Sequence, residues 1–110
     1  MQNYSKNEVV LVRYPFADLS SSKVRPAVVI STPHISDDIF VVPLTSKTAD
    51  SLLPGEFILT DGNNAGLNVI TEVKRGIYTA NRSLVIKVVG KLSSSDSQRI
   101  ESSLRKWLGF

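Results

Sequence analysis

The C-terminal stretch SLVIKVVGKLSSSDSQRIESSLRKWLGF (residues 83–110) decides the fold class, because the spacing of its apolar residues changes halfway along. Residues 83–92 form a short run rich in valine, which predicts a β-strand. Beyond this run the apolar residues recur at the spacing of an amphipathic helix: Ile100, Leu104, Trp107 and Leu108. The chain therefore ends with a strand followed by one helix.

Both ends of this helix carry suitable polar or small residues. We expect Ser94 or Ser95 to cap the first turn, where a hydroxyl accepts a hydrogen bond from a backbone amide. Asp96 suits the positive end of the helix dipole, and Gly109 marks the stop. Trp107 is expected to pack in the core or in a dimer interface.

The rest of the chain consists of short apolar runs separated by polar turns, which is typical of a mainly β domain. Further strands are expected at residues 8–16, 25–31, 38–46, 56–60 and 67–73. Pro43 indicates an edge or a bulge, and DGNNAG (61–66) is a dense turn signal. Strands followed by a single helix predict a small, strongly bent sheet or barrel closed by the helix.

Composition places limits on the class of protein. The chain has 110 residues, 42% hydrophobic and 21% charged, so we expect one globular domain spanning residues 1–110. Cysteine is absent, which excludes disulfides and thiolate metal sites and suits a reducing cytosol. No apolar run approaches the roughly 20 residues that span a bilayer. The N-terminus lacks the layout of a signal peptide, and we expect a cytoplasmic protein.

Motifs for metal or triad chemistry are weak. The single histidine, His34, lies near Asp37 and Asp38 in HISDD, a pattern that can bind a hard cation. No second cluster at a ligand spacing accompanies it, and no nucleophile elbow or phosphate-binding loop is present. We therefore expect no metal and no cofactor.

Two residues at strand ends are candidates for phosphate chemistry. Arg25 follows a serine-rich loop at the start of a strand, where its planar fork can meet a phosphate. A guanidinium stays charged and suits the extra negative charge of a pentacoordinate phosphorus transition state. The alternative is a surface arginine paired with an acidic neighbour. Thr45 ends another strand, where its hydroxyl can bind an oxyanion or cap a turn. The net charge of +3 fits either a polyanionic partner or plain solubility.

Segments in a fixed order resemble the MazF/PemK family of toxins from type II toxin–antitoxin modules. VLVRYPFADLSSSKVRPAVVIS (10–31) is similar to the N-terminal signature of that family: strand, long loop, Arg-Pro, strand. FVVPLTS (40–46) falls where the family has a strand ending in threonine or serine, and GL (66–67) begins the next strand. YTANRSLVIKVVGKLSSSDSQRIESSLRKWLGF (78–110) matches the closing pattern, so the resemblance covers nearly the whole chain.

The resemblance implies a fold and an activity. It implies a small SH3-like barrel of the MazF/PemK/CcdB type with a C-terminal helix, usually as a homodimer. The implied activity is that of an mRNA interferase, a sequence-selective endoribonuclease that cleaves single-stranded RNA without a metal and inhibits translation and growth. The ribose 2′-hydroxyl attacks the adjacent phosphate and leaves a 2′,3′-cyclic phosphate. A disordered antitoxin with acidic and apolar residues is the implied protein partner.

The resemblance also implies roles for particular residues. Arg25 becomes the main catalytic candidate, which stabilises the phosphorane, and Thr45 becomes its partner at the scissile phosphate. Residues 19–24 form one wall of the RNA groove. The candidate RNA-binding residues are Phe16, Ser20, Ser21, Ser22, Lys23, Lys74, Arg75, Tyr78 and Thr79. An aromatic residue after a proline, such as Phe16, is more often a lid over the barrel end, and Tyr78 can equally be a surface tyrosine.

Two positions depart from the family pattern. Arg75 occupies the place of an acidic residue that some relatives use as a general base, and Glu72 is three residues away, so the base is unassigned. Tyr78 stands where the family often has an arginine. These departures keep an alternative open, a non-catalytic toxin on the same barrel that binds a protein such as a gyrase or binds nucleic acid passively. A plain interaction domain without a nucleic-acid role is the third hypothesis.

Overall fold

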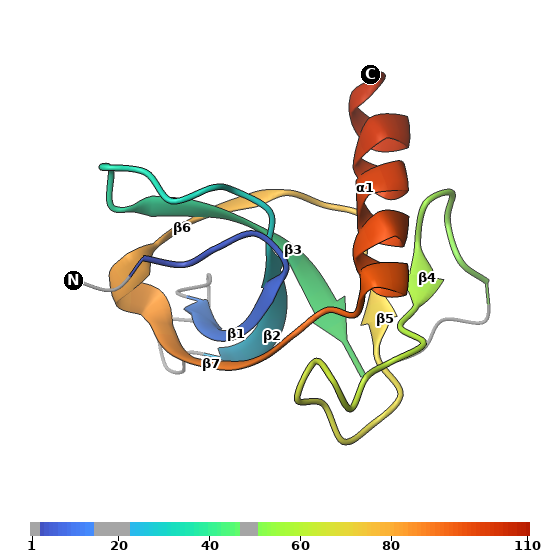
Figure 1. Cartoon of the computed structure of the whole chain (residues 1–110), viewed down its shortest axis with the longest axis horizontal. Coiled ribbons are helices and arrows are strands. Elements are labelled where there is room, and N and C mark those ends of the chain that lie inside the picture. Colours follow the sequence, from blue (N-terminus) through green and yellow to red (C-terminus); the bar gives the residue numbers. More distant parts are fainter. Residues whose placement is uncertain (1–2, 15–22, 47–50) are drawn as a thin grey trace.

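A computed structural model describes residues 3–14, 23–46 and 51–110 of the chain (Figure 1). Its elements in chain order are β1 (Glu8–Tyr14), β2 (Lys23–Val29), β3 (Asp38–Thr45), β4 (Phe57–Ile58), β5 (Glu72–Val73), β6 (Tyr78–Asn81), the 3₁₀ helix η1 (Arg82–Leu84), β7 (Val85–Lys91) and α1 (Ser94–Leu108). The expected fold class, mainly β with one C-terminal helix, is confirmed. The part of the chain that is described contains no helix long and apolar enough to cross a membrane.

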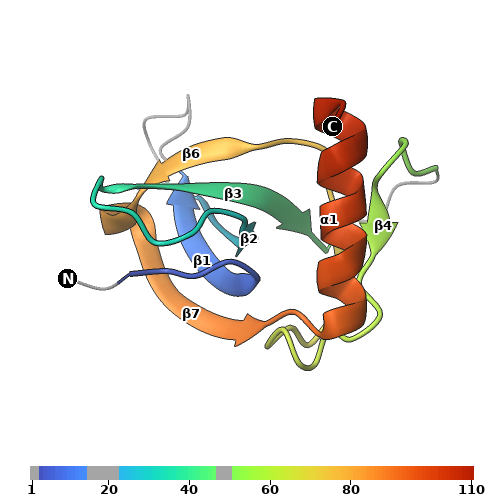
Figure 2. The same cartoon turned by 45° about the horizontal axis from the view of Figure 1, so that its top comes forward.

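The strands form one bent antiparallel sheet in the order β4-β5-β3-β2-β1-β7. Two strands pair with successive parts of β3. Its first half, Asp38–Val41, pairs with β6, and its end, Leu44–Thr45, pairs with β5. Among the described strands, β4 and β7 at the two ends do not pair with each other, so the sheet is open rather than a closed barrel. Two register shifts in the β1–β7 pair accompany the strong curvature of β7, which Figure 2 shows.

Several strand boundaries differ from the expected ones. β4 and β5 are only two residues long. Val69 and Ile70, expected within the strand of residues 67–73, are exposed and precede β5. β2 begins at Lys23, two residues before the expected start. The apolar runs alone do not predict β6, because YTAN is only four residues long and lacks an apolar pattern.

Both faces of the sheet are buried, as the short valine-rich runs predict. The first core cluster lies between the sheet and α1 and comprises Val9, Val28, Val42, Leu44, Phe57, Leu59, Ala65, Val73, Leu92 and Ile100. The second lies on the opposite face and comprises Tyr4, Val10, Val12, Ala27, Val29, Ile39, Val41 and Ala80. Alternate residues of β1, β2 and β3 therefore belong to different clusters, which fixes the face that each remaining side chain occupies.

Two glycines allow the 61–66 turn to pack directly on β7. A Cβ at Gly90 would collide with the backbone of Ala65, and a Cβ at Gly66 would collide with the backbone of Val89. Gly66 also has a φ of 76°, a region that favours glycine. Gly66 of GL (66–67) and Gly90 of GKLS (90–93) therefore allow the two backbones to pack closely.

Helix α1 is capped at its start by Ser93 and at its end by Gly109. Its N-cap is Ser93, whose hydroxyl accepts a hydrogen bond from the Asp96 amide, so the expectation of Ser94 or Ser95 was wrong by one or two residues. Each serine of this run could cap a helix in the same way. The buried position of Asp96 decides which of them does so. Gly109 ends the helix in the left-handed conformation with φ 79°, as expected.

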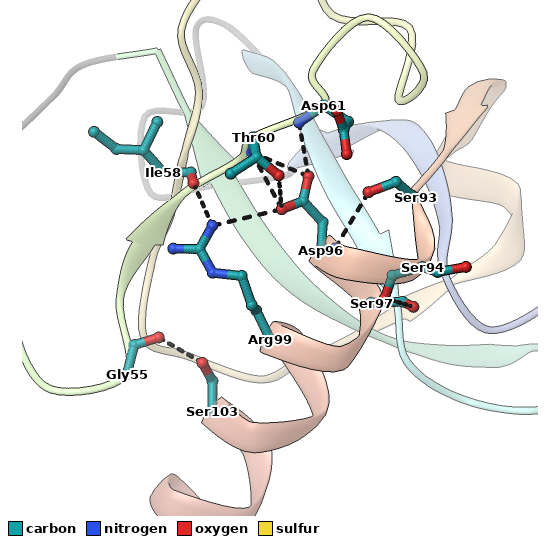
Figure 3. A network of polar contacts seen from close by, with 10 residues as sticks. All are labelled: Gly55, Ile58, Thr60, Asp61, Ser93, Ser94, Asp96, Ser97, Arg99 and Ser103. Atoms are coloured by element: carbon teal, nitrogen blue, oxygen red, sulfur yellow. Dashed lines mark hydrogen bonds and ion pairs between the residues drawn. The ribbon is translucent and has the colours of Figure 1, made fainter.

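Asp96 joins α1 to the segment after β4, as Figure 3 shows. Its side chain is fully buried, and its carboxylate accepts hydrogen bonds from the amides of Thr60 (3.1 Å) and Asp61 (3.0 Å). The Thr60 hydroxyl donates a further bond at 2.8 Å. The Arg99 guanidinium lies 3.6 Å from the same carboxylate and donates to the Ile58 carbonyl. Asp96 therefore anchors the helix as well as complementing its dipole.

Further along α1, two polar contacts hold the residues that precede β4. The Ser103 hydroxyl donates to the Gly55 carbonyl at 2.6 Å, and the Trp107 indole donates to the Pro54 carbonyl at 2.9 Å. Trp107 packs against the first core cluster, so its expected role in the core is confirmed. The segment 54–61, which carries Glu56, is thereby attached to the helix along most of its length.

Candidate functional site

Strands β2 and β3 bring Arg25 and Thr45 together. The register of this pair places Val29 opposite Val41 and Ala27 opposite Pro43. Continuing the same register by two residues places Arg25 opposite Thr45, on the face of the second core cluster. Ala27 and Val29 are fully buried, so the strand that presents Arg25 is anchored in the core.

A cationic pocket opens beside this pair, with a volume of about 410 Å³. Its lining residues are Lys23, Arg25, Pro43, Leu44, Thr45, Lys74, Arg75 and Tyr78. The pocket brings together side chains from β2, β3, β6 and the segment that follows β5. With four basic side chains and one aromatic ring, it is suited to a phosphate and an unpaired base.

A second pocket of about 460 Å³, lined by a mixture of apolar and polar residues, adjoins the first. Its lining residues are Leu11, Val24, Arg25, Pro26, Thr45, Ser46, Leu67, Val69 and Thr71. Arg25 and Thr45 are the residues that line both pockets. They therefore stand where a chain-like ligand running from one pocket to the other would pass.

Arg25 is exposed, and its guanidinium donates a hydrogen bond to the Val24 carbonyl at 3.1 Å. Within the described residues no carboxylate forms an ion pair with it. Arg25 lines both pockets, so its guanidinium can meet an anionic ligand there.

Lys74 is held by two carboxylates at the rear of the cationic pocket. Its ammonium lies 3.6 Å from Glu72 Oε2 and 3.9 Å from Glu56 Oε1. The Glu72 side chain is fully buried, and Glu72 is the register partner of Thr45 across the β3–β5 pair. Sequence reasoning set Glu72 aside because of its distance along the chain from Arg75. Only strand pairing reveals its position beside Thr45.

Glu56 titrates below its ordinary range. Burial alone would raise the pKa of this carboxyl, but hydrogen bonds from the amides of Arg75 and Leu53 and the charges of Lys74 and Arg75 outweigh that effect and lower it. Because its pKa is lower in the folded state, the ionised carboxylate stabilises the fold above pH about 4.5, the ordinary value. This stability is lost as the pH falls through the lowered pKa.

We therefore expect Glu56→Gln to reduce the melting temperature at pH 7, with a smaller difference from the wild-type chain at pH 3. Thermal unfolding followed by circular dichroism across this pH range measures the difference. Glu101→Gln is the control, because Glu101 is an exposed helix residue whose ion pair with Arg105 contributes little. A constant difference between Glu56→Gln and the wild-type chain at all pH values would contradict the expectation.

The remaining predicted residues are spread more widely. Tyr78 lines the cationic pocket with its side chain 46% exposed, so its ring is accessible for stacking. Thr79 follows it on the opposite face of β6, across from Phe40, and lines neither pocket. Phe16 and the loop serines (Ser20, Ser21 and Ser22) lie outside the described residues.

The HISDD segment lies apart from these pockets. His34 is exposed, and its Nδ1 accepts a hydrogen bond from the Ser36 amide. Asp37 pairs with Arg82 at 2.9 Å. Across residues 3–14, 23–46 and 51–110, no group of three or more histidine, cysteine or acidic side chains is arranged to hold a metal ion.

Known structures share this fold over the whole chain. An endoribonuclease from mycobacterial species has a TM-score of 0.77 and 15% identity, with coverage of 100% of this chain and 95% of that chain. A mycobacterial endoribonuclease in complex with its cognate antitoxin gives 0.77 and 15%, with coverage of 100% and 97%. MazF from Deinococcus radiodurans gives 0.77 and 21%, with full coverage of both chains. At these identities the likeness establishes the fold alone.

Sequence comparison identifies the family. No curated protein matches the chain significantly. Residues 5–108 match the family described as "PemK-like, MazF-like toxin of type II toxin-antitoxin system". This match spans nearly the whole chain and includes every described strand and the helix. The chain therefore belongs to the PemK-like, MazF-like toxins of type II toxin–antitoxin systems.

Proposed function

We propose that this toxin is an endoribonuclease that cleaves single-stranded mRNA without a metal ion and thereby inhibits translation and growth. Family membership and the fold shared with proteins named endoribonucleases support the activity. The observation that carries the proposal is that Arg25 and Thr45 line both the cationic pocket and the second pocket beside it. Single-stranded RNA offers phosphates to the first and unstacked bases to either.

The proposed reaction is a transfer within the RNA. The ribose 2′-oxygen forms a bond to the adjacent phosphorus, its proton passes to a base, and the bond from phosphorus to the 5′-oxygen breaks. The leaving oxygen takes up a proton, so the products are a 2′,3′-cyclic phosphate and a 5′-hydroxyl. A phosphorus with five oxygen neighbours carries extra negative charge on its non-bridging oxygens. The Arg25 guanidinium stabilises this charge with two parallel donors, and the Thr45 hydroxyl orients the phosphate.

The other basic and aromatic residues of the cationic pocket bind the neighbouring nucleotides in this proposal. Lys23, Lys74 and Arg75 attract phosphates, and Tyr78 stacks on a base, a contact that contributes about 1–3 kcal/mol. Residues Phe16, Ser20, Ser21, Ser22 and Thr79 remain predictions from the family resemblance. RNA cleavage of this kind takes place in the cytoplasm, where mRNA is translated.

An antitoxin is the proposed protein partner. One structural neighbour was solved with its cognate antitoxin, and the chain belongs to a family of toxins from such pairs. A disordered segment with acidic and apolar residues would suit two adjoining pockets that combine basic side chains with apolar ones. We also propose a homodimer. Leu108 and Phe110, exposed apolar residues at the end of α1, support it.

The test is cleavage of a fluorescently labelled single-stranded RNA by the purified chain in excess chelator. We expect RNA to be cut and DNA of the same sequence to remain intact, because DNA lacks the 2′-hydroxyl. Cleavage that requires a divalent cation would contradict the metal-independent reaction. Tight, salt-sensitive binding without cleavage would instead favour a non-catalytic nucleic-acid-binding toxin.

A further inference from the structure

Glu72 occupies an unusual position for a charged residue. Its side chain is fully buried in β5, with Thr45 of β3 as register partner on one side and Ile58 of β4 on the other. Residues directly opposite in an antiparallel pair direct their side chains to the same face of the sheet. The Glu72 carboxylate therefore lies behind the cationic pocket, next to the hydroxyl that is proposed to orient the phosphate.

Lys74 connects this buried carboxylate to the pocket. Glu72 and Lys74 are two residues apart in an extended segment, so both side chains occupy the same face. The Lys74 side chain is 35% exposed, whereas the two carboxylates beside it are 0% and 4% exposed. Its ammonium therefore lies between buried negative charge and the surface that lines the pocket. A buried carboxylate that loses its cation is strongly destabilised, so the pair is held together.

We propose that Glu72 is a positioning residue of the cleavage site, which holds the Lys74 ammonium ready to meet an RNA phosphate beside Arg25. This inference rests on the proposed function. A free lysine has a long flexible stem and loses conformational freedom when it binds a phosphate. A lysine already held by a buried carboxylate has lost part of that freedom before the RNA arrives. The carboxylate also offsets the repulsion between Lys74 and Arg25 in the empty pocket.

The burial of Glu72 argues against a direct role as the base that removes the 2′-hydroxyl proton. A ribose hydroxyl must approach within hydrogen-bonding distance of a base, and the Glu72 side chain has no surface exposed to the pocket. Neither pocket is lined by Glu72. Its influence on an RNA phosphate is therefore indirect, and Lys74 is a residue that contacts Glu72 and also lines the pocket.

A double-mutant cycle tests this role with four proteins: the wild-type chain, Glu72→Gln, Lys74→Gln and the double variant. Glutamine keeps the shape of Glu72 and one acceptor oxygen, replaces the other oxygen with an NH2 donor, and removes the charge. We expect each single variant to lower the single-turnover rate of RNA cleavage about tenfold, since a misplacement of about 1 Å can cost up to 100-fold. The double variant should be no slower than Lys74→Gln alone, because Glu72 acts through Lys74.

Three controls separate positioning from other roles. Glu101→Gln makes the same change of charge on the exposed face of α1 and should leave the rate unchanged. Melting temperatures identify a purely structural role: a Glu72→Gln variant that melts earlier yet cleaves at the wild-type rate would overturn the proposal. A double variant slowed by the product of the two single effects would also overturn it, because Glu72 would then act independently of Lys74.

Binding to an all-2′-deoxy oligonucleotide, measured by fluorescence anisotropy, tests the same coupling without chemistry. If the wild-type chain cleaves no RNA, the proposed function fails, while this second cycle still decides the role of Glu72. Non-additive losses of affinity from Glu72→Gln and Lys74→Gln support positioning. Additive effects, or an effect of Glu72→Gln equal to that of Glu101→Gln, overturn it.

Discussion

Arg25→Ala is expected to lower the rate of single-stranded RNA cleavage by about 100-fold or more, the usual effect of removing a group that stabilises transition-state charge. Arg25 is shared by the cationic pocket and the second pocket, and among the described residues no carboxylate forms an ion pair with its guanidinium. Arg25→Lys keeps the charge but loses the planar fork, so it should recover only part of the rate. Single-turnover cleavage of labelled RNA measures both variants.

Lys106→Ala is the matched control for the Arg25 variants. Lys106 is an exposed residue in the last turn of α1, and its replacement removes one positive charge on the helix. We expect this variant to cleave at nearly the wild-type rate. If Arg25→Ala and Lys106→Ala cleave equally fast, Arg25 is not a catalytic residue and the assignment of the site is wrong.

Asp96→Ala is expected to lower the free energy of unfolding by about 3 kcal/mol or more, because it leaves buried hydrogen-bond donors without their charged acceptor. The lost bonds come from the amides of Thr60 and Asp61 and from the Thr60 hydroxyl. For a domain of this size the melting temperature should fall on the order of 10 °C. Asp96→Asn preserves the shape and should be less damaging. Thermal and urea unfolding measure both variants.

Glu101→Ala gives the comparison for Asp96, since both are acidic residues of α1. Glu101 is exposed and makes an ion pair with Arg105 at 3.3 Å, so its loss should cost less than about 0.5 kcal/mol. A similar, small loss of stability for Asp96→Ala and Glu101→Ala would show that the buried network does not anchor the helix.

The local pattern of apolar residues in the sequence is sufficient to predict much of this fold. The change from β-branched runs to helical spacing predicts the C-terminal helix, and Gly109 ends it as expected. β1, β2, β3 and β7 lie close to where the short apolar runs predict them. Local signals fail where short elements depend on their neighbours. β6 has no apolar pattern of its own and exists because it pairs with the first half of β3.

The candidate site is predictable only in part, for a related reason. Arg25 and Thr45 stand at strand ends, a position visible in the sequence, and the pairing of β2 with β3 brings them to the same pockets. The relation of Glu72 to Thr45 depends on which strand pairs with the end of β3 and in which register. A shift by one residue would direct Glu72 to the opposite face, so its spacing from Arg75 in the chain carries no information about its place.

The chemistry of the cut ends tests the central claim most directly. The purified wild-type chain is incubated with a single-stranded RNA in excess chelator, and the fragments are analysed by mass spectrometry. The proposed attack of the 2′-hydroxyl predicts fragments that end in a 2′,3′-cyclic phosphate and begin with a 5′-hydroxyl, and none with Arg25→Ala on the same time scale. Intact RNA, or fragments that carry a 5′-phosphate, would contradict it.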